Sequence, residues 1–145
     1  MKVRFTKTDP EAVTPSYGSE GAAAFDLYAL PDGEVTIEPG CTEFIHTGIC
    51  LEIPEGYVGL VFARSGLASK RGLAPANKVG VVDSDYRGEI MVALHNHSSE
   101  AQTIAPRERL AQMSIVPFMR AELELCNELS DTERGTGGFG STGRM

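Results

Sequence analysis

The sequence lacks the features that mark membrane-spanning, exported and disulfide-stabilised proteins. It has no tryptophan, and its three cysteines have no CxxC spacing, so neither a disulfide framework nor a zinc motif is indicated. No apolar run approaches the roughly 18 residues of a transmembrane helix, and the charged residues 1–7 precede no apolar signal-peptide segment. These absences, with an odd cysteine count, predict a soluble protein of the reducing cytoplasm.

Basic residues are also scarce. Thirteen Lys and Arg stand against 20 Asp and Glu, which gives a net charge of −7, and no basic run occurs. Proteins that bind duplex nucleic acid or anionic membranes derive much of their affinity from clustered Lys and Arg. We therefore expect neither nucleic acid nor a membrane as a partner.

The residues that are present indicate one domain of the all-β class. The length of 145 residues is that of a single domain. The apolar residues alternate with a period of two between Gly and Pro turns, which is typical of a sandwich, barrel or jelly roll. One short helix is expected at 65–71, with Ser65 as its N-cap and Gly72 as its C-cap. Strands are expected at residues 34–38, 44–53 (one or two strands), 57–63, 79–82, 90–94, 110–116 and 121–125.

The C-terminal end differs from the rest, and we expect a body of residues 1–133 followed by a mobile arm, 134–145. Five of the ten residues 134–143 are glycine. They contain a GxGxxG pattern, but too few residues follow it to form the helix that a dinucleotide fold needs. A P-loop is also excluded, because Ser141 stands where the lysine belongs.

The chemistry behind those two motifs still applies to the arm. Successive glycine amides can turn toward an anion, and Arg134, Ser141 and Thr142 add one cation and two hydroxyl donors. Phe139 either stacks on a ligand or simply docks on the surface. The composition favours a functional arm.

Two segments of the body carry candidate site residues. Arg64-Ser65-Gly66 offers a guanidinium, a hydroxyl and amides to an anion, although an ordinary helix N-cap would show the same residues. Ser65 lacks the GxSxG context of a nucleophile. Asp83 directly follows two valines at a strand end, where a carboxylate can be held rigidly and act as a general base, with the ring of Tyr86 beside it.

Other polar residues have structural interpretations. The stretch 81–91 is expected as a strand, a tight hairpin and a strand. His95 and His97 have the spacing of two zinc ligands on one strand face, but no third ligand is near in sequence. His46 is expected to be structural. Asp26 is a lone carboxylate in an apolar run and is expected to pair with an arginine.

Taken together, five segments resemble the five ordered motifs of the trimeric dUTP pyrophosphatases (dUTPases). The resemblance runs from residue 23 to 143, nearly the whole chain. Ala24 is a departure, because the family usually has Gly there, and Glu89 lies at a variable position. The five segments, in order, are residues 23–27, 64–68, 80–88, 109–112 and 134–143.

The resemblance implies a jelly-roll or distorted-barrel subunit in a homotrimer, with three active sites between subunits. The implied reaction is dUTP and water to dUMP and pyrophosphate, with Mg²⁺ chelated mainly by the triphosphate and no protein metal ligand. Such an enzyme limits uracil in DNA and supplies dUMP for dTMP synthesis.

The resemblance also implies a role for each matching residue. Asp83 would orient and deprotonate the attacking water, and Tyr86 would pack on deoxyribose and exclude a 2′-hydroxyl. Asp26 would act in structural pairing or in an outer-shell magnesium contact. Uracil would be read by Asn77 and by main chain near Val81, Val82 and Met91. Arg64, Ser65, Gly66 and Gln112 match contacts to phosphate, metal-bound water and attacking water. Arg134, Phe139, Gly140, Ser141 and Thr142 match the arm that closes over the nucleotide.

Two alternatives remain beside this interpretation. The related dCTP deaminases share the fold but use a glutamate in the role of the base, whereas this chain has Asp83. A non-catalytic jelly-roll module that only binds or senses dUTP is a second alternative, but this chain keeps all the candidate catalytic groups. A structural, shell-like role would need neither Asp83 nor the arm.

Overall fold

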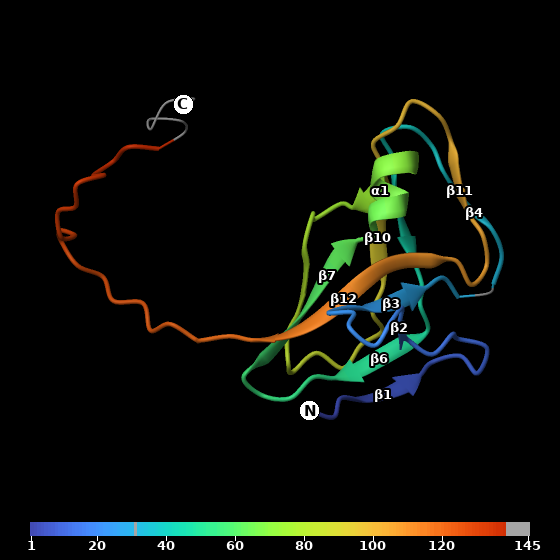
Figure 1. Cartoon of the computed structure of the whole chain (residues 1–145), viewed down its shortest axis with the longest axis horizontal. Helices are drawn as coiled ribbons and strands as arrows, with labels where there is room; N and C mark the ends of the chain where they lie inside the picture. The colour runs from blue at the N-terminus through green and yellow to red at the C-terminus, as the bar shows by residue number, and fades with distance from the viewer. Residues whose placement is uncertain (31, 139–145) are drawn as a thin grey trace.

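The computed structural model describes residues 1–30 and 32–138, which form twelve strands and one short helix (Figure 1). The strands with all their bounds are β1 (Arg4–Lys7), β2 (Ser16–Tyr17), β3 (Phe25–Tyr28), β4 (Val35–Ile37), β5 (Thr42–Ile45), β6 (Ile49–Glu52), β7 (Tyr57–Ala63), β8 (Leu73–Pro75), β9 (Gly80–Val82), β10 (Val92–Asn96), β11 (Gln102–Ile104) and β12 (Arg109–Pro117). The helix α1 spans Ser65–Arg71. The expectation of a mostly β fold with one short helix is confirmed.

The strands pair into four open sheets. The largest has the order β2-β3-β12-β7-β9, and β5-β10-β8 form a second sheet. Two pairs, β1-β6 and β11-β4, make the remaining sheets. Within the described ranges no sheet closes into a barrel, and no helix is long and apolar enough to cross a bilayer.

The core lies between these sheets, because the inward residues of each strand are apolar. On β10, Val92 and Leu94 are buried, whereas Ala93 and His95, which alternate with them, are partly exposed. β12 is the central strand of the largest sheet and pairs with β3 on one side and β7 on the other. This strand therefore fixes the register of the residues that β3 and β7 carry.

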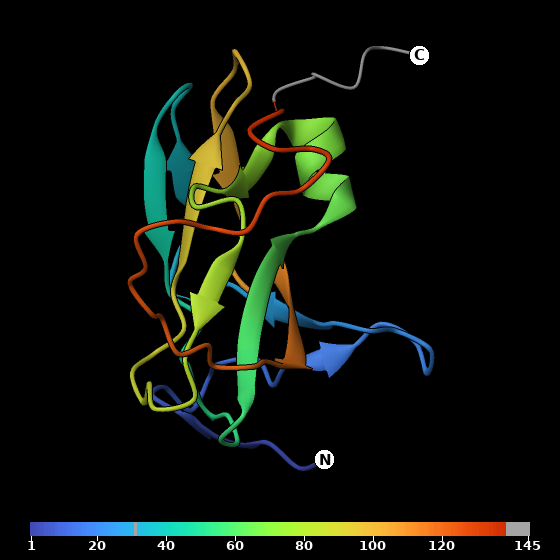
Figure 2. The same ribbon diagram turned by 90° about the vertical axis from the view of Figure 1, so that its left-hand side faces the viewer.

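Helix α1 forms where it is expected, at the end of the body opposite the N-terminus (Figures 1 and 2). Gly72 ends it with a left-handed φ of 66°, as predicted. The N-cap is Arg64 rather than Ser65, and no side chain caps the helix. The prediction that Ser65 caps the helix is therefore wrong, because Ser65 is itself the first residue of α1.

Side-chain bonds hold α1 against the strands. Arg71 donates to Gln102 Oε1 at 3.0 Å, to Glu108 Oε1 at 2.5 Å and to the Thr103 carbonyl at 2.5 Å. Leu67 is the buried residue of the helix. These bonds hold the end of α1 against β11 and against the residue that precedes β12.

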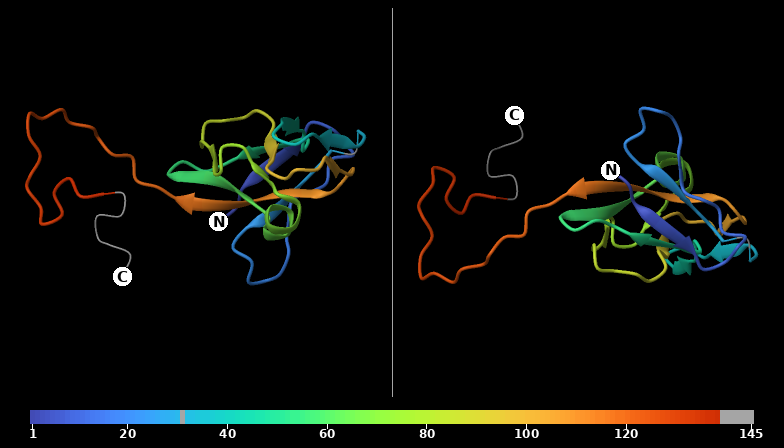
Figure 3. Two further views of the ribbon diagram at one scale, coloured as in Figure 1. Left: turned by 90° about the horizontal axis from the view of Figure 1, so that it is seen from above. Right: turned by 90° about the horizontal axis from the view of Figure 1, so that it is seen from below.

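The strand expected at residues 121–125 does not form. Beyond β12 the chain leaves the body as an extended tail (Figures 1 and 3). Leu123 and Leu125 are 93% and 99% exposed. The period-two apolar pattern is real, but a strand also needs a neighbour to bond with, and in the described part of this chain the segment has none.

The hairpin expected at residues 81–91 is also wrong. β9 pairs with β7 in the large sheet, whereas β10 pairs with β5 and β8 in the second sheet. Residues 83–91 are therefore a connection between two sheets. We refer to this connection as the 83–91 loop.

Candidate active site

Six of the residues predicted for the site line one cavity of about 300 Å³, which we call the nucleoside cavity. Its walls come mainly from β9, the 83–91 loop, the end of β8 and the beginning of β10. Exposed apolar side chains face it, with Val81 63% and Met91 45% exposed. The six predicted residues are Asn77, Val81, Val82, Asp83, Tyr86 and Met91.

The packing of β9 against β7 shapes this cavity. A Cβ atom on Gly80 would lie 3.0 Å from Val61 Cβ and 3.4 Å from Asn77 Nδ2, so only glycine lets the strands and Asn77 approach this closely. β9 is the edge strand of its sheet, and its free edge keeps main-chain donors and acceptors unpaired within the sheet. The cavity thus combines apolar side chains with main-chain hydrogen-bonding groups.

Asp83 lies at the rim of the nucleoside cavity, directly after β9. Its backbone carbonyl accepts a hydrogen bond from the Tyr86 amide at 3.2 Å. The carboxylate is exposed, and none of the described residues donates to it. Asp83 also borders a larger cavity of about 800 Å³, lined mostly by charged residues that include Arg4, Glu52 and Arg87. The position is open to water on both sides.

Tyr86 is held by the residues that follow it. Its hydroxyl donates to the Glu89 carbonyl at 3.0 Å. A Cβ on Gly88 would lie 2.4 Å from the same hydroxyl, so the ring packs directly on a glycine backbone. Tyr86 is 45% exposed and presents its ring to the cavity.

Sequence reasoning missed Glu89, which lines the same cavity. Its carboxylate accepts hydrogen bonds from His46 Nδ1 at 2.9 Å and from the amides of Thr47 and Gly48 at 3.1 and 2.7 Å. Burial alone would raise the pKa of Glu89, but these donors outweigh it and hold the pKa below its usual value. These three partners lie more than 40 residues from Glu89 in the chain, so no local sequence pattern predicts the hydrogen bonds.

A second group of predicted residues lines a separate cavity of about 180 Å³, which we call the phosphate cavity. The predicted residues are Arg64, Ser65 and Gln112, joined by Asp26 and Arg109. The register of β12 brings them together, because Gln112 lies opposite Asp26 of β3 and Ala111 lies opposite Ala63 of β7, which precedes Arg64.

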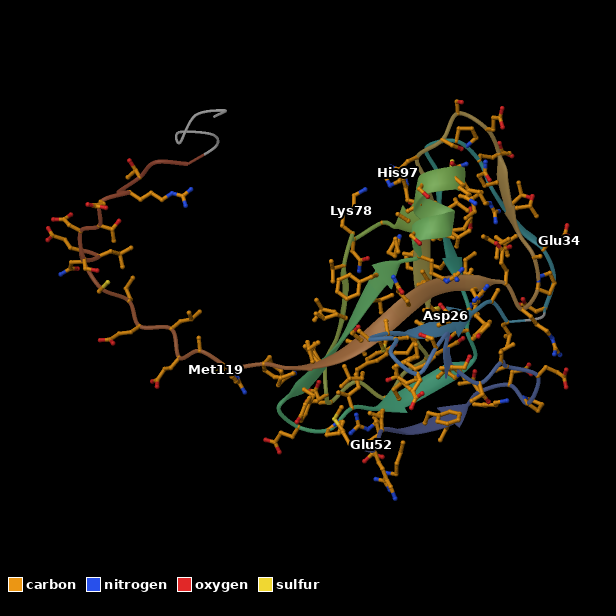
Figure 4. All side chains as sticks on the ribbon, viewed as in Figure 1. Asp26, Glu34, Glu52, Lys78, His97 and Met119 are labelled. Carbon is orange, nitrogen blue, oxygen red and sulfur yellow. The ribbon has the colours of Figure 1, made fainter. Side chains whose placement is uncertain are left out.

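Asp26 pairs with arginine, as predicted. Arg64 Nε donates to Asp26 Oδ1 at 2.9 Å, and Arg109 approaches Asp26 Oδ2 at 3.4 Å. Asp26 lies at the middle of the body (Figure 4) and is only 8% exposed. Arg109 begins the motif at residues 109–112 but was not predicted as a site residue. The available signal was that two of the matched motifs, at 64–68 and 109–112, each begin with an arginine that could pair with the lone acid Asp26. Two cations share one carboxylate, so the cavity retains positive charge.

Gln112 is oriented by the strand beside it. Its Nε2 donates to the Ala63 carbonyl at 2.9 Å, which leaves Oε1 as an acceptor. Ser65 lies at the first position of α1. Gly66 is exposed on α1 and does not line the phosphate cavity.

Of the predicted arm residues the structure describes Arg134, which lines neither of these cavities. Arg134 Nε donates to the Gly137 carbonyl at 2.8 Å within a turn of the tail. The predictions for Phe139, Gly140, Ser141 and Thr142 fall outside the described residues. The nucleoside and phosphate cavities share no lining residue, so the predicted site is divided into two halves.

The histidines have polar partners of their own. His95 Nδ1 lies 2.8 Å from Thr42 Oγ1, and His97 Nε2 lies 2.9 Å from Lys78 Nζ (Figure 4). Partial desolvation, then the charges of Lys78 and His95, lower the pKa of His97. In residues 1–30 and 32–138, no group of three or more His, Cys, Asp or Glu side chains is placed to hold a metal ion.

Comparisons with known proteins agree on one family. The family model for dUTPase matches residues 10–143. Deoxyuridine 5′-triphosphate nucleotidohydrolase of Desulfitobacterium hafniense is 51% identical over 144 residues, which are 99% of this chain and 95% of that protein. The same-named protein of Nautilia profundicola is 50% identical over 99% of this chain and 100% of its own length.

Solved structures give the same result. A mutant dUTPase of Staphylococcus bacteriophage 80alpha with dUpNHpp has a TM-score of 0.88 at 28% identity, and 98% of each chain is covered. A mutant dUTPase of phage phi11 of S. aureus, described with a structural Mg(II) ion, has a TM-score of 0.78 at 25% identity over 88% of this chain and 98% of its own. The chain therefore belongs to the dUTPase family.

Proposed function

We propose that this protein hydrolyses dUTP to dUMP and pyrophosphate by attack of water on the α-phosphorus, with Asp83 as the base. The observation that carries the proposal is the nucleoside cavity, which gathers Asn77, Tyr86 and the free edge of β9 around one exposed carboxylate. Family membership supplies the substrate class. The reaction would limit uracil in DNA and supply dUMP for dTMP synthesis.

Uracil would be selected by hydrogen bonds to a fixed strand edge. Asn77 and the main chain near Val81 and Val82 would pair with its carbonyl and imide groups. Cytosine has the opposite donor and acceptor order, and each buried group left without a partner costs about 1–3 kcal/mol. The methyl group of thymine would meet the close packing of Gly80 on Val61.

The sugar and the water would be placed by the 83–91 loop. Tyr86 would pack on deoxyribose, and its fixed hydroxyl leaves little freedom for the ring to make room for a 2′-hydroxyl. Asp83 would accept a proton from the attacking water, a task that suits an exposed carboxylate without competing donors among the described residues.

The phosphate cavity would hold the triphosphate. Arg64 bonds Asp26 through Nε, so its two terminal nitrogens remain for phosphate oxygens. Gln112 Oε1 can accept a hydrogen bond from a water molecule, and the Ser65 hydroxyl can donate or accept. In-line attack needs this positioning and charge neutralisation more than any covalent chemistry.

The residues present fit a magnesium ion that arrives on the triphosphate. Mg²⁺ takes oxygen ligands in near-octahedral geometry, and the acid of the phosphate cavity, Asp26, is already paired with two arginines. Ser65 and Gln112 would therefore hold the metal through its water. When bound, the ion neutralises phosphate charge and so makes the α-phosphorus easier to attack.

We further propose a homotrimer of jelly-roll subunits in which each site is assembled between copies. The two cavities of one chain are separate, although one dUTP would need both. The tail leaves its own body with exposed leucines, which is what a segment that packs on another copy requires. Arg134, Phe139, Gly140, Ser141 and Thr142 would then close over a nucleotide bound by other chains.

A nucleotide panel tests the function. Pyrophosphate and ammonia release are measured with dUTP, dCTP, UTP and dTTP in the presence of Mg²⁺. We expect pyrophosphate from dUTP alone and ammonia from none. Ammonia from dCTP would instead identify a deaminase, and tight dUTP binding without turnover would identify a binding protein.

A further inference from the structure

Glu89 joins the 83–91 loop to the rest of the body. Its carboxylate accepts three hydrogen bonds, from His46 Nδ1 and from the Thr47 and Gly48 amides. The other side-chain bonds of residues 83–89, from Tyr86 and Arg87, all end on carbonyls of the same segment. Among the residues described, Glu89 is thus the one side chain that fastens this segment to the body.

The turn that receives Glu89 is rigid. Gly48 has a left-handed φ of 69°, and a Cβ there would lie 2.6 Å from Ala12 Cβ. Thr47 is 1% exposed, and its hydroxyl donates to the Ile90 carbonyl at 2.6 Å. The carboxylate therefore binds a fixed part of the molecule that is made of buried backbone.

The contact continues from Glu89 to Tyr86. The Glu89 carbonyl accepts the Tyr86 hydroxyl at 3.0 Å, and the Tyr86 ring lies on Gly88. Tyr86 also borders the cavity in which the nucleoside would lie. The position of the ring is consequently set by the position of the Glu89 backbone. A β-bridge to Cys50 holds this backbone, and the Glu89 carboxylate fastens it further to the 47–48 turn.

We propose that Glu89 is a positioning residue that sets the discrimination between deoxyribonucleotides and ribonucleotides by anchoring Tyr86. This inference rests on the proposed function, in which Tyr86 packs on the sugar. Without the anchor, the loop moves away from the 47–48 turn and the ring no longer closes the space that a 2′-hydroxyl would occupy. Glu89 touches the turn, while the chemistry at Asp83 stays intact.

The test compares Glu89→Ala, Glu89→Gln and the matched control Glu43→Ala. Glu43 is an exposed acid on β5, the strand that precedes the receiving turn, and no described residue bonds its side chain. For each variant, kcat and KM are measured with dUTP and with UTP. Circular dichroism, thermal unfolding and solution mass establish that each variant is folded and assembled.

We expect Glu89→Ala to lower the ratio of kcat/KM for dUTP over UTP about tenfold, the order expected for losing charge-assisted hydrogen bonds. The change should come mainly from a higher KM for dUTP, with kcat within about threefold of wild type. Glu89→Gln keeps an oxygen for the Thr47 and Gly48 amides, so it should retain most of the selectivity. Glu43→Ala should leave the ratio unchanged.

A general loss of structure would lower kcat/KM for dUTP and for UTP by the same factor and leave their ratio unchanged. That result would overturn the proposal. If Glu89→Ala does not fold, His46→Ala removes one of the three donors and should lower the ratio about twofold to threefold. An unchanged ratio in His46→Ala would then also refute it. A wild-type protein that does not prefer dUTP to UTP would refute the proposed function instead, so the two failures are distinguishable.

Discussion

The nucleoside and phosphate cavities are built in opposite ways. The phosphate cavity lies at β3, β12 and the end of β7, neighbouring strands of one sheet, and its charges are already paired through Asp26. The nucleoside cavity lies largely on a loop that connects two sheets, and it is lined by exposed apolar side chains. Its carboxylate, Asp83, has no partner among the described residues.

The difference suits the two parts of a nucleotide. A triphosphate needs fixed positive charge, and a sheet with paired arginines supplies it without reorganisation. A base and sugar need shape and hydrogen-bond complementarity, which a loop anchored near one end, at Glu89 and Ile90, can provide while still admitting the ligand. If the proposed function holds, we expect selectivity to depend on the loop and phosphate affinity to depend on the sheet.

The comparison predicts its largest effect at Asp83. Asp83→Asn should lower kcat for dUTP about 10³-fold, since general bases contribute in this range. It should leave the dissociation constant for dUTP within about threefold, because the phosphate contacts are untouched. Stopped-flow pyrophosphate release and calorimetric binding measure the two quantities.

Asp32→Asn is the control, because it removes the same charge at an exposed position outside both cavities. It should behave as wild type. Hydrolysis by Asp83→Asn at the wild-type rate would remove Asp83 from the role of base and leave the nucleoside cavity as a binding surface only.

Mixing two inactive variants tests whether the cavities of different copies cooperate. Asp83→Asn and Arg64→Gln are unfolded together, mixed in equal amounts and refolded. If each site takes Asp83 from one chain and Arg64 from another, random assembly restores about one quarter of the wild-type sites. Steady-state dUTP hydrolysis measures the recovery.

The matched control mixes Asp83→Asn with Tyr86→Ala. Both changes lie in the nucleoside cavity, so every mixed site keeps one defect, and the activity of the mixture should not exceed that of its Tyr86→Ala chains alone. Absence of recovery in the first mixture would place both halves of the site on one chain and would contradict the assembly between copies.

The sequence predicted the parts of the fold that depend on local pattern. The apolar run at residues 57–63 predicted β7, and Gly72 after residue 71 predicted the end of α1, both with the observed bounds. The lone acid Asp26 gave its arginine pairing, because a buried charge requires a partner. These features are decided within a few residues or by elementary electrostatics.

What could not be predicted depends on pairing between distant residues. Residues 121–125 have the strand period but no neighbour, and the 83–91 loop connects strands that belong to different sheets. Glu89 likewise meets Gly48 across 41 positions. Period alone shows which face of a segment is apolar, and it contains no information about the strand or turn that the segment meets.

The smallest expected effect concerns the pH dependence of the anchor of the nucleoside cavity. Because the pKa of Glu89 is lowered in the folded protein, its contribution to stability is present above the pKa of the unfolded chain. That contribution is lost as the pH falls through the lowered, folded-state value. Glu89→Gln cannot titrate, so its melting temperature should lie below that of wild type at neutral pH, and the difference should shrink on acidification.

Calorimetric scans of both proteins between neutral and acidic pH measure this difference. Glu52→Gln is a suitable comparison, because Glu52 also has a lowered pKa through its bond to Arg4 but is paired on the exposed surface. Solvent screens that pair, so its variant should show a smaller difference at neutral pH. Suppose the two variants differ equally from wild type in melting temperature at neutral pH. The three hydrogen bonds to Glu89 would then stabilise the protein no more than a surface ion pair does, which would contradict the role of Glu89 as the anchor of the nucleoside cavity.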